Sequence, residues 1–274
     1  HSTYNLPKDS IKFVTANYKL HDVNPFIYFP DDELYYRYLH IIENNYVKHH
    51  HTKQREKKYT CLIRADKIWR KIYASFLNQL DIAKYGYFSY TGYKYDTSHQ
   101  GLDDIDLWKD YDDTLHQDLL SFEMKTPISC DNLSVSDHNN HKLINHDYFT
   151  NAYFNFVVET HFDNDTIFLT EKTFKPILNL QPFIIVGNPG SLQLLKKLGY
   201  KTFEDVVRED YDTMTNHRDR MSQLLKISYD LCTLTDKHHI RIQEIISDVL
   251  IHNQQHFIAP KINRINGLLK ALEY

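Results

Sequence analysis

The distribution of apolar and polar residues divides the chain into ordered blocks that are separated by polar stretches. Apolar runs at residues 59–63, 154–158 and 182–187 predict buried strands, and the last is nearly all apolar, as in a parallel strand covered on both faces. Apolar residues recur every four positions over residues 67–80, which predicts a helix, and the apolar stretch 174–180 follows as another. Strands and helices that alternate in this order indicate an α/β sheet.

Weaker patterns precede the first of these blocks. A short apolar run at residues 11–15 predicts a strand, and carboxylates in a first helical turn predict a helix that begins at Asp31. Residues 48–58 are polar and carry no apolar face, so we expect an exposed loop or linker. Three consecutive histidines lie within it, but adjacent residues do not share a helix face, which favours a solvated loop over a metal site.

The later part of the chain mixes polar and helical stretches. Residues 85–87 (Tyr-Gly-Tyr) are expected to form the turn that closes the first strand–helix unit, and residues 90–151 are polar and poorly periodic. A structureless loop of that length is unusual in a compact domain, so we expect short helices, one of them around 112–122. Ser191 is expected to cap the next helix, and residues 203–274 are predicted to be mostly helical.

Composition narrows the class of protein. The 274 residues are 42% hydrophobic and 25% charged, a mixture typical of globular proteins. The formal charge of −4 argues against a protein whose main task is to coat nucleic acid. The sequence has no run of 18 consecutive apolar residues, which a membrane-spanning helix would need. Its three scattered cysteines fit neither a disulfide framework nor a zinc site of four cysteines. We therefore expect a soluble, cytoplasmic protein without a membrane partner.

Charged residues stand where two predicted elements meet. Glu159 follows a buried strand, and Thr170, Glu171 and Lys172 open the next helix. In open α/β sheets ligands bind outside the carboxyl ends of the strands, where a helix N-terminus presents free N–H groups to phosphates. A carboxylate there can accept from ribose hydroxyls, and a lysine can neutralise a diphosphate. The pattern fits a nucleoside-diphosphate site, although Glu171 and Lys172 are also ordinary first-turn helix residues.

Two blocks of the sequence carry a family resemblance. Residues 156–160 (Phe-Val-Val-Glu-Thr) are followed by Thr-Glu-Lys at 170–172 and by an apolar strand that ends in Gly187. Upstream, an arginine-bearing helix over residues 68–80 precedes the Tyr-Gly pair at 85–86. Together these blocks resemble the donor-binding half of the family 10 glycosyltransferases, the α-1,3/4-fucosyltransferases of GT-B fold.

The resemblance implies a fold and a set of donor-binding residues. It implies a GT-B-like α/β architecture, with a Rossmann-type parallel sheet, helices on both faces, a reduced N-terminal part and a helical C-terminus. Arg70 would contact the donor diphosphate, Glu171 the ribose hydroxyls and Lys172 the phosphates. Glu159 and Thr170 would complete the donor pocket.

The resemblance also implies a division of the chain and an activity. Residues 1–58 would be a remnant or part of an acceptor domain, and residues 59–274 the nucleotide-sugar-binding domain. A fucose-like sugar would pass, with inversion, from a nucleotide-diphosphate donor, with GDP favoured, to a glycan or other hydroxyl acceptor. No metal cofactor is required, because Arg70 and Lys172 already place two cations on the phosphates. The general base is unassigned; Asp31, Asp32 and Glu33 qualify by composition and equally fit helix capping.

Other interpretations of the sequence stay open. The chain can be a non-catalytic nucleotide-sugar or glycan-binding module of a longer protein. Two Asp-x-Asp patterns suit Mg²⁺ or Mn²⁺ and a GT-A enzyme, but they also fit a solvated acidic loop. A histidine cluster is a weaker metal candidate, because its spacing matches no zinc helix. The residues of these two patterns are Asp104, Asp106, Asp110 and Asp112, and His138, His141 and His146.

Overall fold

The main structural unit is a parallel sheet. A computed structural model describes residues 13–20, 26–30, 33, 46–93, 114–130, 144–163, 166–260, 266 and 269–270. Its larger sheet has the strand order β4-β3-β5-β6, and all neighbouring strands are parallel. These strands are β3 (Lys57–Ala65), β4 (Gly86–Tyr93), β5 (Ala152–Val158) and β6 (Phe183–Val186). A separate parallel pair joins β1 (Phe13–Thr15) to β2 (Phe26–Tyr28).

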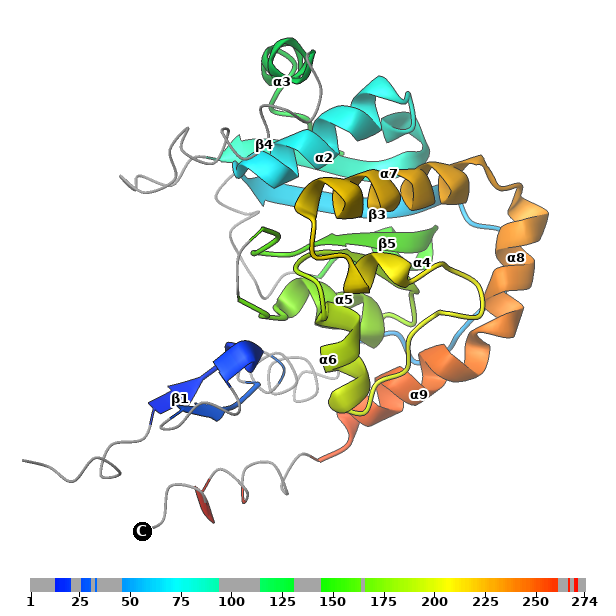
Figure 1. Cartoon of the computed structure of the whole chain (residues 1–274). Helices are drawn as coiled ribbons and strands as arrows, with labels where there is room; N and C mark the ends of the chain where they lie inside the picture. The colour runs from blue at the N-terminus through cyan, green and yellow to red at the C-terminus, as the bar shows by residue number, and fades with distance from the viewer. Residues whose placement is uncertain are drawn as a thin grey trace, which may run out of the picture.

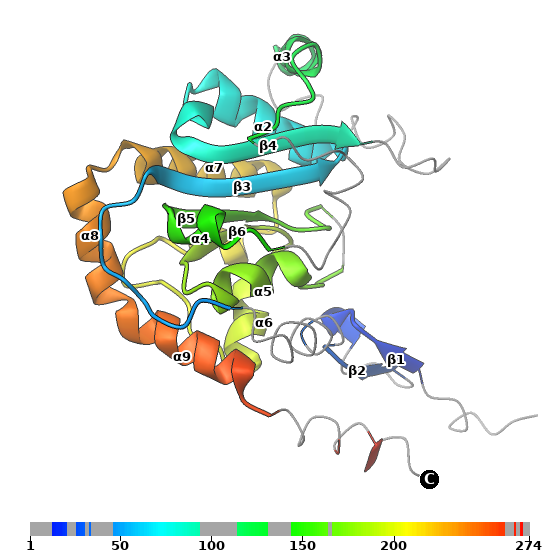
Figure 2. The ribbon, with the colours of Figure 1, turned by 180° about the vertical axis from the view of Figure 1, so that it is seen from behind.

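Helices lie on both faces of the larger sheet, which confirms the predicted α/β class. Helices α2 (Ile68–Gln79) and α7 (His217–Thr233) cover the face that Figure 1 shows. Helix α4 (His146–Thr150) lies on the opposite face, seen in Figure 2. The sheet is therefore a covered inner layer, in agreement with its apolar strands.

The remaining helices border the sheet. Helices α8 and α9 wrap around the edge formed by the amino ends of the strands (Figures 1 and 2). Helix α3, expected around residues 112–122, packs against α2. The bounds are α3 (Leu115–Glu123), α5 (Glu171–Leu178), α6 (Ser191–Lys197), α8 (Asp236–Ile245) and α9 (Ser247–Ile258), with 3-10 turns at Tyr18–Leu20, Ala83–Tyr85 and Asp210–Thr213.

The order of the strands places a switch point at the centre of the sheet. From β3 the chain passes through α2 to β4, and then crosses back over β3 to form β5 on its other side. Helix α5 then leads to β6. The connection that leaves β3 leads toward β4, and the connection that leaves β5 leads toward β6, on the other side of the sheet. The loops that leave these two neighbouring strands therefore diverge. Such a point is where open parallel sheets bind ligands, outside the carboxyl ends of the strands.

Strand β4 corrects the sequence prediction. The expected turn at residues 85–87 ends at Gly86, where an eight-residue strand begins, and Tyr59 pairs with Gly86 in the parallel ladder. A Cβ atom on Gly86 would lie 2.4 Å from the ring of Tyr59, so only glycine fits beneath it. Two glycines and several hydroxyl side chains hide the strand from an apolar pattern, and its partner β3 is distant in sequence.

The start of α6 also differs from the prediction. Gly190, at φ +85°, occupies the N-cap position that was expected for Ser191. The carboxylate of Asp212 accepts hydrogen bonds from the N–H groups of Leu192 and Gln193, at 2.9 and 3.0 Å. A residue some twenty positions downstream therefore caps this helix, which a local pattern cannot reveal.

The expected exposed loop at residues 48–58 is wrong at its carboxyl end. Arg55 is only 8% exposed, and its guanidinium donates to the carbonyl oxygens of Phe149 and Ala152. Strand β3 begins at Lys57, within the same polar stretch. Upstream, the carbonyl of Val47 accepts from Gln254 on α9. The stretch thus packs along the amino edge of the sheet.

Candidate functional site

Two connections meet at the switch point. Arg64 near the end of β3 and Arg70 in the first turn of α2 flank one connection. Glu159 directly after β5 and Glu171 at the start of α5 flank the other. Burial lowers the pKa values of both arginines, and the negative charge of Glu171 acts on both in the opposite direction. The structure therefore brings Arg70 and Glu171, predicted from separate blocks of sequence, into one electrostatic environment.

Glu159 is held inside the protein rather than facing solvent. It is 2% exposed, and its Oε1 atom accepts from the Thr170 N–H at 3.0 Å and from the Thr173 hydroxyl at 2.7 Å. Its Oε2 atom accepts from the Thr170 hydroxyl at 2.7 Å and from the Thr160 N–H at 3.2 Å. The carboxylate thus fixes the end of β5 to the first turn of α5, where negative charge is favoured.

Arg70 is a buried residue of the first turn of α2. It is 4% exposed, and its Nε and Nη2 atoms donate to the carbonyl oxygen of Glu159 at 3.3 and 2.9 Å. The bond ties the start of α2 to the end of β5, on the two sides of the switch point. Arg70 therefore supplies positive potential from beneath the site and also holds its backbone in place.

The helix N-terminus of α5 presents an adjacent acid and base. Thr170 is the N-cap, and its hydroxyl oxygen accepts from the Lys172 N–H at 3.4 Å. The Lys172 ammonium donates to Glu171 Oε1 at 2.8 Å and to the Thr170 hydroxyl at 3.1 Å. Exposed fractions are 29% for the lysine side chain and 13% for the glutamate. Both groups are oriented by the helix start and still reach solvent.

Further basic residues at this edge were not predicted. Arg64 is the next-to-last residue of β3 and lies over the ring of Tyr93, 5.2 Å from its centroid. Lys67 donates to the carbonyl oxygen of Thr160 at 3.0 Å. Lys175 lies one turn after Glu171, and burial lowers its pKa to about 8. A charged residue at the end of a predicted strand is the signal that would have found Arg64; the other two look like ordinary helix lysines.

Most of the candidate bases and metal-binding patterns lie outside the described residues. Asp31 and Asp32 lie outside the described residues, and Glu33 is buried, with its carboxylate accepting from the Tyr200 hydroxyl at 2.5 Å. The four aspartates of the Asp-x-Asp patterns, like His138 and His141, also lie outside the described residues. His146 bonds to Asn179. Within the described ranges no three His, Cys, Asp or Glu side chains form a metal-binding group.

The arrangement is suited to an anion that carries hydroxyl groups. Basic side chains outnumber carboxylates around the start of α5, and the N–H groups of that helix add positive potential. Glu171 provides the carboxylate that hydroxyl groups can donate to. A polyphosphate with an attached sugar combines these two chemistries.

Comparison with known proteins gives no independent assignment. No family model, curated protein or solved structure matches this chain. Among the helices of the described part, none combines the length and the apolar character needed to cross a membrane. The case for a function therefore depends on the site itself and on the resemblance of its motifs.

Proposed function

We propose that this chain is an inverting glycosyltransferase with a GT-B-like architecture, similar to the family 10 glycosyltransferases. It would transfer a fucose-like sugar from a nucleotide-diphosphate donor, GDP-linked in our proposal, to a hydroxyl acceptor. The observation that carries the proposal is the convergence of Arg64, Arg70 and the Glu171–Lys172 pair at the switch point of a parallel sheet. These side chains come from two connections that are about a hundred residues apart in the sequence.

The donor contacts are divided according to exposure. Lys172 reaches solvent and is oriented by the Thr170 hydroxyl, so we assign it to the diphosphate together with Arg64. Glu171 would accept from the ribose hydroxyls. Two nitrogens of Arg70 already bind the backbone, so Arg70 would act through its positive potential and by holding the β5–α5 connection.

The proposed reaction is a direct displacement. The acceptor oxygen attacks the anomeric carbon while the bond from that carbon to the diphosphate oxygen breaks, and the acceptor proton passes to a base. Negative charge builds up on the departing diphosphate, where Lys172, Arg64 and the α5 N-terminus would stabilise it. Preorganised charges of this kind replace a metal ion in the proposal.

A nucleotide panel tests the donor assignment. Thermal unfolding is measured with GDP, UDP, CDP and ADP, because a ligand bound to the folded state raises the apparent melting temperature. GDP is expected to give the largest increase, and Lys172→Ala to abolish it. Lys226→Ala, an exposed lysine on α7, serves as the control that retains the increase. The absence of any nucleotide effect on the wild-type protein would overturn the proposal.

A non-catalytic donor-binding module is the second candidate. It is favoured by Glu33, the described candidate base, whose buried carboxylate is already bonded to Tyr200. Incubation of the protein with labelled GDP-fucose and a panel of glycans separates the two. Transfer or hydrolysis of the sugar indicates an enzyme, whereas binding without turnover indicates the module.

A further inference from the structure

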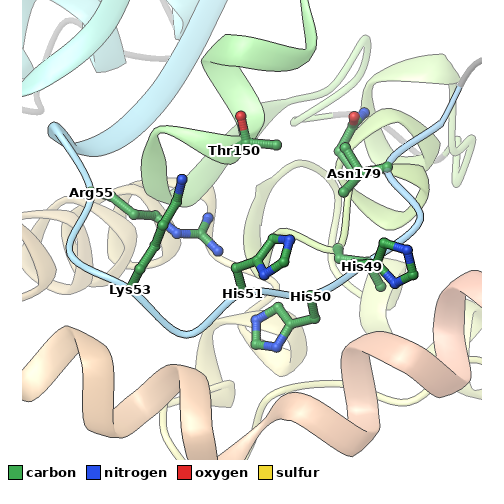
Figure 3. A pocket seen from close by; sticks show the side chains of 9 residues that line it. His49, His50, His51, Lys53, Arg55, Thr150 and Asn179 are labelled. Atoms are coloured by element: carbon green, nitrogen blue, oxygen red, sulfur yellow. The ribbon is translucent and has the colours of Figure 1, made fainter.

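A pocket lies at the opposite edge of the sheet, where the strands begin. It is a small cavity of about 40 Å³ that is partly open to solvent. Its walls come from the segment before β3, from the end of α4 and from the residues that follow α5 (Figure 3). The lining residues are Val47, His49, His50, His51, Lys53, Arg55, Thr150, Asn179 and Leu180. The proposed donor site, in contrast, is formed at the carboxyl ends of the strands.

The lining of this pocket is basic. Lys53 and Arg55 are permanent cations, three imidazoles lie beside them, and no carboxylate is among the lining residues. In an extended segment residues two apart lie on the same side, and the rings of His49 and His51 are accordingly 6.3 Å apart. His49 and His51 are exposed and lie outside any helix or strand, as the prediction of a solvated loop requires. The histidines therefore belong to a basic pocket.

Arg55 provides a donor that lacks a partner. Its Nη1 atom donates to the carbonyl oxygens of Phe149 and Ala152, and its Nη2 atom donates to Gln243 Oε1 at 2.9 Å. The Nε atom is buried and has no hydrogen-bond partner within the described residues. Buried donors are nearly always satisfied by protein, water or ligand. In Figure 3 the guanidinium points toward the ring of His51.

His50, the middle histidine, already has hydrogen-bond partners within the protein. Gln243 Oε1, which accepts from Arg55, lies 2.9 Å from His50 Nε2, so this ring nitrogen must be the donor. His50 Nδ1 pairs with the Ser247 hydroxyl at 3.3 Å. Burial lowers the pKa of His50, which favours its neutral form. Lys53, His49 and His51, which are exposed, are left as the adaptable groups of the pocket.

We propose that this pocket binds a phosphate group. The ammonium of Lys53 would donate to its oxygens, the guanidinium of Arg55 would add positive charge from the pocket wall, and His49 and His51 would close the open side. A metal dication is disfavoured, because two permanent cations face the same space and no carboxylate offsets them. Inorganic phosphate and a phosphate monoester share this chemistry. The proposal is independent of the donor site, because the two sites lie at opposite edges of the sheet.

The test follows the imidazole signals of the histidines by NMR while inorganic phosphate is added at constant ionic strength. We expect saturable shifts of the His49 and His51 signals. Lys53→Gln should weaken the affinity about tenfold, as expected for the loss of a charge-assisted hydrogen bond. Lys48→Gln removes an exposed lysine of the same segment that does not line the pocket, and it should leave the affinity unchanged.

Further arms identify the source of the phosphate and the outcomes that would overturn the proposal. Tighter binding of glycerol phosphate than of inorganic phosphate would support a monoester ligand, and the reverse order would support the free ion. Unshifted imidazoles, an unchanged affinity in Lys53→Gln, or tighter binding of Zn²⁺ than of phosphate would each overturn it. Loss of the shifts in Lys172→Ala would do the same, because it would assign phosphate to the donor site.

Discussion

The two edges of the parallel sheet both gather basic side chains, but they treat the charge differently. At the carboxyl edge Arg70 and Lys172 have carboxylates beside them, in Glu159 and Glu171. At the amino edge Arg55 is buried against carbonyl oxygens and an amide, and no carboxylate lines its pocket. Paired charges fix the local geometry, whereas a cation without a neighbouring carboxylate favours the binding of an anion. For this reason we assign the proposed nucleotide-sugar site to the carboxyl edge and the proposed phosphate pocket to the amino edge.

The largest effect on the free energy of unfolding is expected from a substitution that removes the charge pairing at the carboxyl edge. Glu159→Gln places amide protons against the hydroxyl and N–H donors of Thr170 and Thr173 and removes a carboxylate that offsets Arg70. Removal of one partner from a buried charged group typically costs about 3–5 kcal/mol in the free energy of unfolding. Urea denaturation measures it. Glu244→Gln, at an exposed ion pair of α8, is the control; a similar small loss in both variants would contradict the pairing.

The second prediction concerns His239 at the amino edge, whose protonated form is disfavoured by burial. His239 of α8 is buried and stacks on Tyr153, with ring centroids 4.3 Å apart. Burial, aided by the charge of Lys58, lowers its pKa to about 4. The folded state thus keeps the ring neutral while the unfolded state takes up a proton near pH 6.5. Stability is full above that pH and falls as the pH drops toward 4, by about 3 kcal/mol.

His239→Phe tests this pH dependence, because phenylalanine retains the stacking on Tyr153 without a titrating group. The free energy of unfolding of both proteins is measured by urea denaturation between pH 7 and pH 4. The difference between them should change steadily through this range in favour of the variant. Parallel curves would show that His239 titrates alike in both states.

The sheet itself was largely predictable, since β3, β5, β6 and their helices follow from apolar runs and helical spacing. Strand β4 was not, because Gly86 serves the packing of Tyr59 and contributes no apolar signal. At the proposed donor site the sequence indicated Glu171, Lys172 and Arg70 as a group. It did not indicate that Glu159 is fully engaged by protein donors, because such bonds depend on how the β5–α5 loop folds back.

The amino edge was hidden for a related reason. Arg55 lies in a run of charged residues that is typical of a solvated loop, yet the loop supplies buried donors to carbonyl groups at the end of α4 and the start of β5. A run of charged residues predicts an exposed loop only if no carbonyl group elsewhere in the fold accepts a hydrogen bond from it. Arg55 bonds to carbonyl groups about a hundred positions away in the chain, and a single sequence does not reveal such long-range contacts.

A matched pair of threonines sharpens the comparison at a smaller scale. Thr173 is fully buried and donates to Glu159 at 2.7 Å, whereas the half-buried Thr150 donates to the carbonyl of His146 in its own helix at 3.1 Å. Thr173→Val should cost about 1–2 kcal/mol in the free energy of unfolding, because a buried charged acceptor loses a donor. Thr150→Val should cost less than about 0.5 kcal/mol. Equal losses in denaturant titrations would contradict the special role of Glu159.

The smallest effect is expected at an exposed ion pair of the amino edge. Lys58 donates to Asp236 at 2.5 Å, and this hydrogen bond lowers the aspartate pKa although its side chain is 37% exposed. Lys58→Gln should reduce the free energy of unfolding at pH 7 by about 0.5 kcal/mol, since solvent screens the pair. The folded carboxylate titrates below the unfolded one, so the loss should be full above the ordinary aspartate pKa of about 3.9 and should shrink as the pH falls below it, through the folded pKa. A loss that stays constant as the pH falls below the ordinary aspartate pKa would contradict this origin.

The central claim is that the carboxyl edge, and not the amino edge, receives the nucleotide. Calorimetric titration of GDP into the wild-type protein, Lys172→Ala and Lys53→Gln tests it directly. We predict that Lys172→Ala weakens GDP binding at least about tenfold, through loss of a charge-assisted contact to phosphate, and that Lys53→Gln changes it less than about twofold. An unchanged affinity in Lys172→Ala together with a loss in Lys53→Gln would contradict the account.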